Sequence, residues 1–299
     1  MGVTFCLELF FWSSLGDFAM NIAEQAAKAE QLKKLHYGPR ILILPNAWDA
    51  ISALIVEDAG FPAVATTSAG VAAALGYPDG QRVQRDEMLE AVARIARAVK
   101  VPVTADLEAG YADTPRQIAE FARATIATGA VGLNFEDITG DDEASFVNLD
   151  LQVEKIAALR EAANSAGVPL VINARTDIYL LPIGPEETRF DRTVQRLRAY
   201  RKAGADCVFA PGIRDRETIG KLVKAVDAPL NILLQPGGAT VRELEKLGVA
   251  RASAGSGPHR SALTRLREVA VALRDYGDHT PLFEKNITWS ETNRLLGRN

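Results

Sequence analysis

The chain has 299 residues, of which 47% are hydrophobic and 24% are charged, and its formal net charge is -4. These proportions are those of an ordinary globular protein, long enough to bury a large core as one barrel or as two smaller domains. Acidic and basic residues are interspersed, so we expect no partnership with nucleic acid or with a membrane. Two cysteines, Cys6 and Cys207, are too few for a disulfide framework, which predicts a cytoplasmic protein with Cys207 packed in the core.

The N-terminal segment is apolar but resembles no targeting signal. Residues 2–18 contain no lysine or arginine, whereas a secretory signal needs a basic start and a membrane span needs about 20 apolar residues. A regular helical pattern begins only at Ile22. We therefore interpret residues 1–19 as an N-terminal extension, and the alternative is a hydrophobic strap onto a partner subunit.

From residue 40 the chain repeats one unit, in which a short apolar strand ends in polar residues and a helix follows, with glycine after the helix. The predicted strands are Ile41–Leu44, Ala63–Thr67, Val101–Asp106, Val131–Glu136, Leu170–Ala174, Cys207–Ala210, Leu230–Leu234 and Arg251–Ala254. Eight such units in succession predict an α/β protein with a closed (β/α)8 TIM barrel.

The alternative of an open dinucleotide-binding sheet is disfavoured, because no glycine-rich fingerprint follows the first strand, where the chain reads Leu44-Pro45-Asn46-Ala47-Trp48. No low-complexity linker divides the chain either. We expect one barrel domain over residues 20–280 and a C-terminal helical appendage over residues 281–299.

Polar residues gather at the predicted strand ends, where barrel enzymes place their active sites. They are Asp79 beyond strand two, Asp106 and Glu108 at the end of strand three, Glu136 at the end of strand four, and Asn173 and Arg175 at the end of strand five. One guanidinium cannot neutralise four carboxylates, and buried carboxylates are costly without a cation, so the pattern predicts a divalent metal site. Ligands that are all oxygen favour Mg²⁺ or Mn²⁺ over zinc. The alternative is a buried salt-bridge network centred on Arg175.

Four motifs stand in order at these strand ends: LGYPD at 75–79, ADLEAGY at 105–111, FED at 135–137 and INARTD at 172–177. On these motifs the chain resembles the isocitrate lyase/phosphoenolpyruvate mutase superfamily over residues 40–277, with a likeness to its carboxyphosphonoenolpyruvate phosphonomutases. The resemblance implies a TIM barrel, a homotetramer that exchanges helices between paired subunits, and a small carboxylate substrate bound to Mg²⁺ as a 2-oxo acid or its enolate.

The resemblance also implies roles for individual residues. Asp106 would contact the metal, and Asp79, Glu108 and Glu136 would act mostly through its water ligands. The Ser68-Ala69-Gly70 turn would donate backbone N–H groups to the substrate carboxylate, and Arg175 would bind that carboxylate with Asn173 nearby. Arg175, Asp79 and Glu136 are the residues expected to serve catalysis.

We therefore expect a Mg²⁺-dependent carbon–carbon lyase that acts on a small 2-oxo or 2-hydroxy acid through an enolate. The loop over residues 138–148 lacks the Lys-Xaa-Cys-Gly-His signature of the superfamily's lyases, so the catalytic proton must come from elsewhere, with water, Tyr77 and Tyr111 as candidates. The alternatives are a phosphonomutase, a hydrolase of phosphonopyruvate or oxaloacetate, and a non-catalytic barrel scaffold.

Two further patterns leave a structural and a functional interpretation open. Gly255-Ser256-Gly257 before the last long helix is typical of a barrel phosphate site, or of a tight connection that needs positive φ. The arginines of residues 192–201 are interpreted as a solvated helix face.

Overall fold

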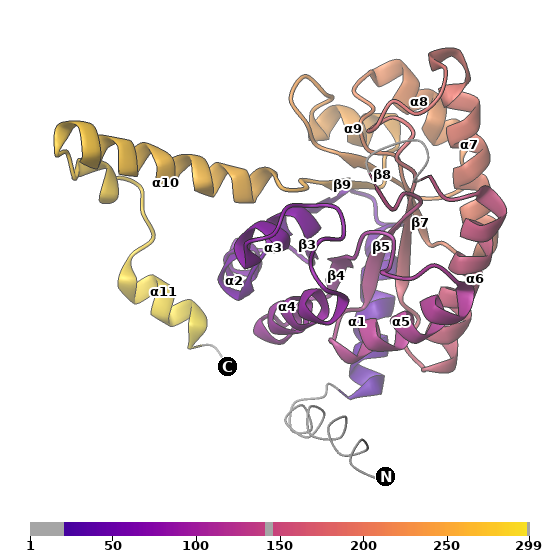
Figure 1. Cartoon of the computed structure of the whole chain (residues 1–299), viewed down its shortest axis with the longest axis horizontal. Coiled ribbons are helices and arrows are strands. Elements are labelled where there is room, and N and C mark those ends of the chain that lie inside the picture. Colours follow the sequence, from indigo (N-terminus) through magenta and orange to yellow (C-terminus); the bar gives the residue numbers. More distant parts are fainter. Residues whose placement is uncertain (1–20, 141–145, 298–299) are drawn as a thin grey trace, which may run out of the picture.

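The computed structural model describes residues 21–140 and 146–297, and it confirms the predicted barrel (Figure 1). All neighbouring strands in the sheet are parallel, in the order β1-β9-β8-β7-β6-β5-β4-β3-β2. The strands are β1 Leu42–Leu44, β2 Asn46–Ala47, β3 Val64–Thr66, β4 Val103–Asp106, β5 Gly132–Glu136, β6 Val171–Arg175, β7 Cys207–Phe209, β8 Leu230–Leu233 and β9 Arg251–Ser253.

The first strand of the barrel is split in two at Pro45. Its first part, β1, pairs with β9, and its second part, β2, pairs with β3, so the sheet closes through the proline. Asn46 reinforces the closure: its Nδ2 donates to the Thr66 carbonyl (2.6 Å), and its Oδ1 accepts from the Ala254 N–H (2.9 Å). The predicted first strand was therefore incomplete, because it stopped at Leu44.

Helices cover the outside of the barrel. They are α1 Ile22–Leu35, α2 Ala50–Asp58, α3 Ser68–Leu75, α4 Arg85–Ala98, α5 Pro115–Ala127, α6 Leu149–Ser165, α7 Glu186–Ala203, α8 Arg216–Ala225, α9 Val241–Leu247, α10 Gly257–Tyr276 and α11 Trp289–Leu296. The helix starts follow from local chemistry; α5, for example, has a capping box between Thr114 and Gln117 and a proline in its first turn. Helix α3 was not predicted, although Thr67 caps its N-terminus and Gly76 ends it at φ +88°.

The interior of the barrel contains polar as well as apolar side chains. Leu44 is fully buried, but so are Asn173 and Arg251. Cys207 is buried on β7 and burial raises its pKa to about 12, which confirms the prediction that this thiol packs in the core.

Helix α10 extends away from the barrel, and the chain then returns so that α11 lies near α2 (Figure 1). Leu295 on α11 is buried, and Arg294 forms an ion pair with Asp58 of α2 (3.3 Å). The C-terminal helical appendage is thus confirmed, whereas the expected N-terminal extension lies outside the described residues. Within those residues no helix has both the length and the apolarity that a membrane crossing requires.

Candidate active site

A cavity of about 1210 Å³ opens at the carboxyl-terminal end of the barrel strands. This is the end at which barrel enzymes carry their active sites. Part of its wall consists of predicted site residues, namely Ser68, Ala69, Asp79, Asp106 and Arg175. The residues after β7, β8 and β9 add Arg214, Gln235, Ser256 and Arg260.

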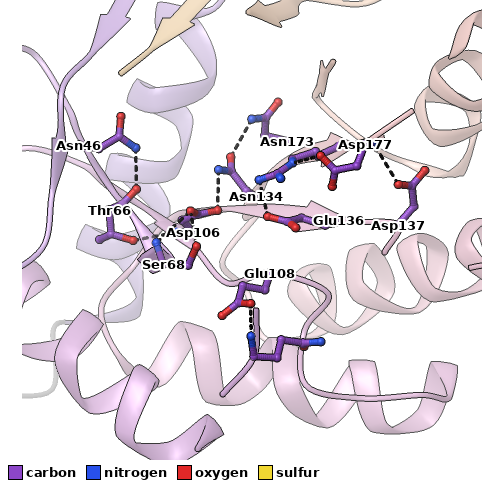
Figure 2. Close-up of polar contacts among 12 residues, drawn as sticks. Asn46, Thr66, Ser68, Asp106, Glu108, Asn134, Glu136, Asp137, Asn173 and Asp177 are labelled. Carbon is purple, nitrogen blue, oxygen red and sulfur yellow. Dashed lines mark hydrogen bonds and ion pairs between the residues drawn. The ribbon is translucent and has the colours of Figure 1, made fainter. Parts of the chain in front are cut away.

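Asp106, at the end of β4, is a buried carboxylate on this wall. Its Oδ2 accepts hydrogen bonds from the backbone N–H and the hydroxyl of Ser68, both at 2.9 Å, and its Oδ1 accepts from Asn134 Nδ2 at 3.0 Å (Figure 2). Asp106 therefore satisfies the N-terminus of α3, a favourable position for a negative charge. The Ser68 N–H, which we expected to bind substrate, is instead engaged by Asp106.

A layer of buried amides below the cavity orients Asp106. Asn134 Oδ1 accepts from Asn173 Nδ2 (2.7 Å) and from Arg251 Nη2 (3.3 Å), which leaves its Nδ2 to donate to Asp106. Asn173 is fully buried and absent from the cavity wall, so it supports Asn134 where we had expected contact with substrate. The role of Arg251 was missed, because a single arginine at the start of a strand gives no signal that it points inward.

Glu108 lies in an unusual backbone segment just after β4. Glu108, Tyr111 and Gln81 all have left-handed φ angles, at 52°, 53° and 57°, which non-glycine residues rarely adopt away from functional sites. The three are joined: Gln81 N–H donates to Glu108 Oε2, Tyr111 OH donates to Glu108 Oε1 (3.0 Å), and Tyr111 N–H donates to Gln81 Oε1 (3.0 Å). Burial raises the pKa of Glu108 to about 7; the hydrogen bond from Tyr111 opposes this, and the charges of Asp106 and Asp79 add to it.

Arg175, at the end of β6, is held between two carboxylates. Its Nη1 donates to Glu136 Oε1 (2.5 Å) and its Nε donates to Asp177 Oδ1 (2.8 Å), while its guanidinium lies 5.7 Å from the centre of the Phe209 ring. Burial raises the pKa of Glu136, and the charge of Arg175 opposes that rise. Glu136 therefore pairs with Arg175 behind the cavity wall, and the remaining N–H groups of Arg175 are available on the wall.

The donor set fits Mg²⁺ held partly by water. In the described part of the chain, no three Asp, Glu, His or Cys side chains are grouped so that they alone could hold a metal ion. Asp106 offers a buried carboxylate at the cavity, and Asp79 lies exposed on the same wall. Mg²⁺ prefers oxygen ligands and keeps several waters, so one direct carboxylate with others beyond the water shell suits this ion.

The remaining predicted elements have mixed outcomes. Gly70 is absent from the cavity wall, and a Cβ at this position would lie 2.6 Å from Thr67 Cγ2, so the glycine serves the packing of α3. Gly255 has φ +53°, and Gly255, Ser256 and Gly257 all line the cavity, so neither interpretation of this segment is displaced. Residues 141–145 of the loop after β5 lie outside the described residues, which include its ends at Ile138 and Phe146, joined by an antiparallel bridge.

A parallel β/α barrel with a cavity at the carboxyl ends of its strands has the architecture of a barrel enzyme, and Arg175 on the cavity wall suits an anionic ligand. Residues 32–274 match the Phosphoenolpyruvate phosphomutase family. The chain belongs to this family, within the isocitrate lyase/phosphoenolpyruvate mutase superfamily.

Three relatives illustrate the similarity. An uncharacterized protein of Mycobacterium tuberculosis is 36% identical over 88% of this chain and 94% of its own length. A structure from Burkholderia cenocepacia J2315, described as a candidate lyase/mutase, is 40% identical with a TM-score of 0.84, covering 91% of this chain and 96% of that chain. A structure of oxaloacetate acetylhydrolase with its product oxalate is 28% identical with a TM-score of 0.80, covering 91% and 94%. The fold alone is also shared with a phosphonopyruvate hydrolase bound to oxalate and Mg²⁺, at 23% identity and a TM-score of 0.79, covering 90% of this chain and 95% of that chain.

Proposed function

We propose that the protein is a Mg²⁺-dependent lyase that cleaves a carbon–carbon bond in a small 2-oxo or 2-hydroxy acid through an enolate. The observation that carries this proposal is the placement of Asp106 and Arg175 on the wall of one cavity at the active end of the barrel. One residue offers a metal ligand and the other offers a carboxylate-binding group. The superfamily contains lyases, mutases and hydrolases, so the type of bond that is broken is the finer part of the proposal.

The chemistry requires charge stabilisation more than a strong nucleophile. Breaking the bond beside a 2-oxo acid places negative charge on the former carbonyl oxygen, and Mg²⁺, when bound, supplies the charge that stabilises it. Asp106 would hold the ion, with Asp79, Glu108 and Glu136 acting beyond its water ligands. Arg175 would bind the substrate carboxylate through its remaining N–H groups, in the planar geometry that suits a carboxylate.

The proton that completes the reaction has a candidate source close to the cavity. Burial raises the pKa of Tyr111, so its phenol stays protonated at neutral pH, and it donates to Glu108. Glu108 accepts the hydrogen bond from that hydroxyl, so the pair could pass a proton through a bound water. Together they offer a route that does not require a cysteine in the loop after β5.

Hydrolysis is the second candidate function. The likeness to oxaloacetate acetylhydrolase over most of both chains favours it, because water could serve as the attacking group in the same cavity. A phosphonomutase is the corresponding isomerase alternative within the matched family. A non-catalytic scaffold is disfavoured, since such a protein has no need to keep a buried carboxylate and a strained backbone segment beside an open cavity.

A substrate screen tests these proposals. Oxaloacetate, substituted malates, phosphonopyruvate, phosphoenolpyruvate and isocitrate would be incubated with the protein and Mg²⁺, and with EDTA as the control. We expect Mg²⁺-dependent release of pyruvate or glyoxylate from one of the carbon acids. Oxalate and acetate from oxaloacetate would establish the hydrolase instead, and conversion between phosphonopyruvate and phosphoenolpyruvate would establish the mutase. A protein that bound Mg²⁺ and a carboxylate but turned over none of these compounds would contradict the lyase proposal.

A further inference from the structure

We propose that Arg196, on the outer helix α7, is a positioning residue for Arg175 and acts through Asp137. The inference rests on the proposed role of Arg175 as the group that binds the substrate carboxylate. Arg196 does not line the cavity, so its effect on substrate binding would be indirect.

Asp137 is the centre of this arrangement. It is fully buried and follows Glu136, the first carboxylate partner of Arg175, directly in the chain. Its Oδ1 accepts from the backbone N–H of Asp177, the second partner, at 3.1 Å, and Figure 2 shows Asp137 beside Asp177. The position of Asp137 therefore bears on both carboxylates that hold Arg175.

Arg196 and Tyr200, one helical turn apart on α7, fix the other oxygen of Asp137. Oδ2 accepts from Tyr200 OH at 2.5 Å and from Arg196 Nη1 at 3.2 Å. Two further contacts hold Arg196 in place. Its Nη2 donates to the Val147 carbonyl (2.9 Å), and its guanidinium lies 3.9 Å from the centre of the Phe146 ring. This overturns, for Arg196, the expectation that the arginines of this helix form a solvated face, because its side chain is only 11% exposed.

The physical reason is the cost of an unpaired buried carboxylate. Burial and the charge of Asp177 raise the pKa of Asp137 to about 6, while Arg196 and the hydroxyl of Tyr200 oppose that rise. Without Arg196, Asp137 would take up a proton or turn away, and either change weakens its hold on the Asp177 N–H. Asp177 would then no longer fix the Nε side of Arg175, and small displacements of a substrate-positioning group lower affinity.

Oxalate is a suitable probe, because it has two carboxylates and is not turned over. Its binding with Mg²⁺ would be measured by isothermal titration calorimetry for the wild type, Arg196→Met and Tyr200→Phe. We expect Arg196→Met to weaken oxalate binding roughly ten-fold, and Tyr200→Phe to weaken it roughly three-fold, because Arg196 still donates to Asp137 Oδ2. Mg²⁺ affinity without oxalate should not change, since the contacts of Asp106 do not include α7.

Arg198→Met is the matched control. Arg198 lies on the same helix, but it is exposed and donates to the Ala225 carbonyl, away from Asp137. Its substitution should leave oxalate affinity at the wild-type value.

A double substitution separates positioning from general destabilisation. If Arg196 acts through Arg175, Arg196→Met should cost little further oxalate affinity in an Arg175→Lys background. Wild-type oxalate affinity in both Arg196→Met and Tyr200→Phe, or an undiminished ten-fold loss in the Arg175→Lys background, would overturn the inference. A wild-type protein that binds Mg²⁺ but no oxalate would instead overturn the proposed function on which it rests.

Discussion

Asp106 is the residue whose surroundings are built most closely around its charge. Three donors from Ser68 and Asn134 hold its two oxygens, so the carboxylate is fixed before any ligand arrives. We expect Asp106→Ala to abolish Mg²⁺ dependence and activity while the protein still folds, because the substitution removes an anionic ligand without inserting bulk. Mg²⁺ titration and circular dichroism would check this, and wild-type Mg²⁺ affinity in the variant would contradict the metal assignment. Asp79→Asn should weaken Mg²⁺ less.

Arg175 is predicted to serve substrate binding more than stability. With Mg²⁺ present, Arg175→Lys should raise KM about 30- to 150-fold, or about 2–3 kcal/mol, since lysine cannot make a two-pronged contact with a carboxylate. Steady-state kinetics and the melting temperature would be compared. An unchanged KM with a lowered melting temperature would show that Arg175 serves only its pairs with Glu136 and Asp177.

His36 gives the molecule a pH dependence that is separate from catalysis. It is buried, its Nδ1 lies 2.8 Å from the Leu32 carbonyl, and burial with the charge of Arg251 lowers its pKa from 6.5 to about 4. The unfolded chain binds a proton that the folded chain does not, so stability falls as pH drops from 6.5 towards 4. Between pH 8 and pH 5 the free energy of unfolding should fall by about 2 kcal/mol from this group. Urea unfolding of His36→Gln should lack this component, and an unchanged slope would contradict it.

At the scale of single residues, the sequence was informative for polar residues that stand at the ends of predicted strands. Asp106 and Arg175 lie at the ends of predicted strands, so their place on the active face could be inferred. The hydrogen bonds between Asn134, Asn173 and Arg251 could not, because they join three strands at a depth that no local pattern encodes. Because no local pattern encodes that depth, we expected Asn173 to contact substrate.

At the scale of helices and strands, two short elements were missed. Strand β2 has two residues and α3 has eight, so neither presents enough of a hydrophobic period to be recognised. Both nevertheless place site residues: β2 carries Asn46 and α3 begins with Ser68. The longer strands were found with small displacements of their ends, since β4 begins at Val103 and β5 at Gly132.

Helix α10 presents an apolar stripe that no other described part of the chain covers. Leu263, Leu266 and Leu273 are exposed, and they recur at intervals that place them on one face of the helix. We propose that this face packs against a second copy of the chain, in keeping with the helix-exchanged homotetramer that the sequence resemblance implies.

Charging this stripe tests that assembly. Leu266→Lys combined with Leu273→Lys should shift the protein towards monomers or dimers in sedimentation velocity, because both side chains would lose apolar contacts. The melting temperature of the barrel should fall only if assembly contributes to its stability. A wild-type protein that sediments as a monomer would contradict the proposal.

For the whole molecule, eight repeated strand–helix units were sufficient to predict a barrel and the face that carries its cavity. They did not reveal how the ring closes or where α10 points, since both depend on contacts between distant parts of the chain. The wall contributed by Arg214 and Arg260 was also beyond sequence reasoning. Arg214 lies between β7 and α8, whereas Arg260 lies on α10, and the two share no motif.

The split strand at Pro45 has a consequence for dynamics. A closed ring has no edge from which to unzip, yet here one segment of the ring is interrupted and the Asn46 amide spans the interruption, from Thr66 on one side to Ala254 on the other. Asn46 and Ala254 also line the cavity. The interrupted part of the ring therefore lies in the wall of the binding site, and a ligand seated there would bridge it. A bound ligand should slow amide hydrogen exchange at Ala254, because ligand binding would also stabilise the closed ring.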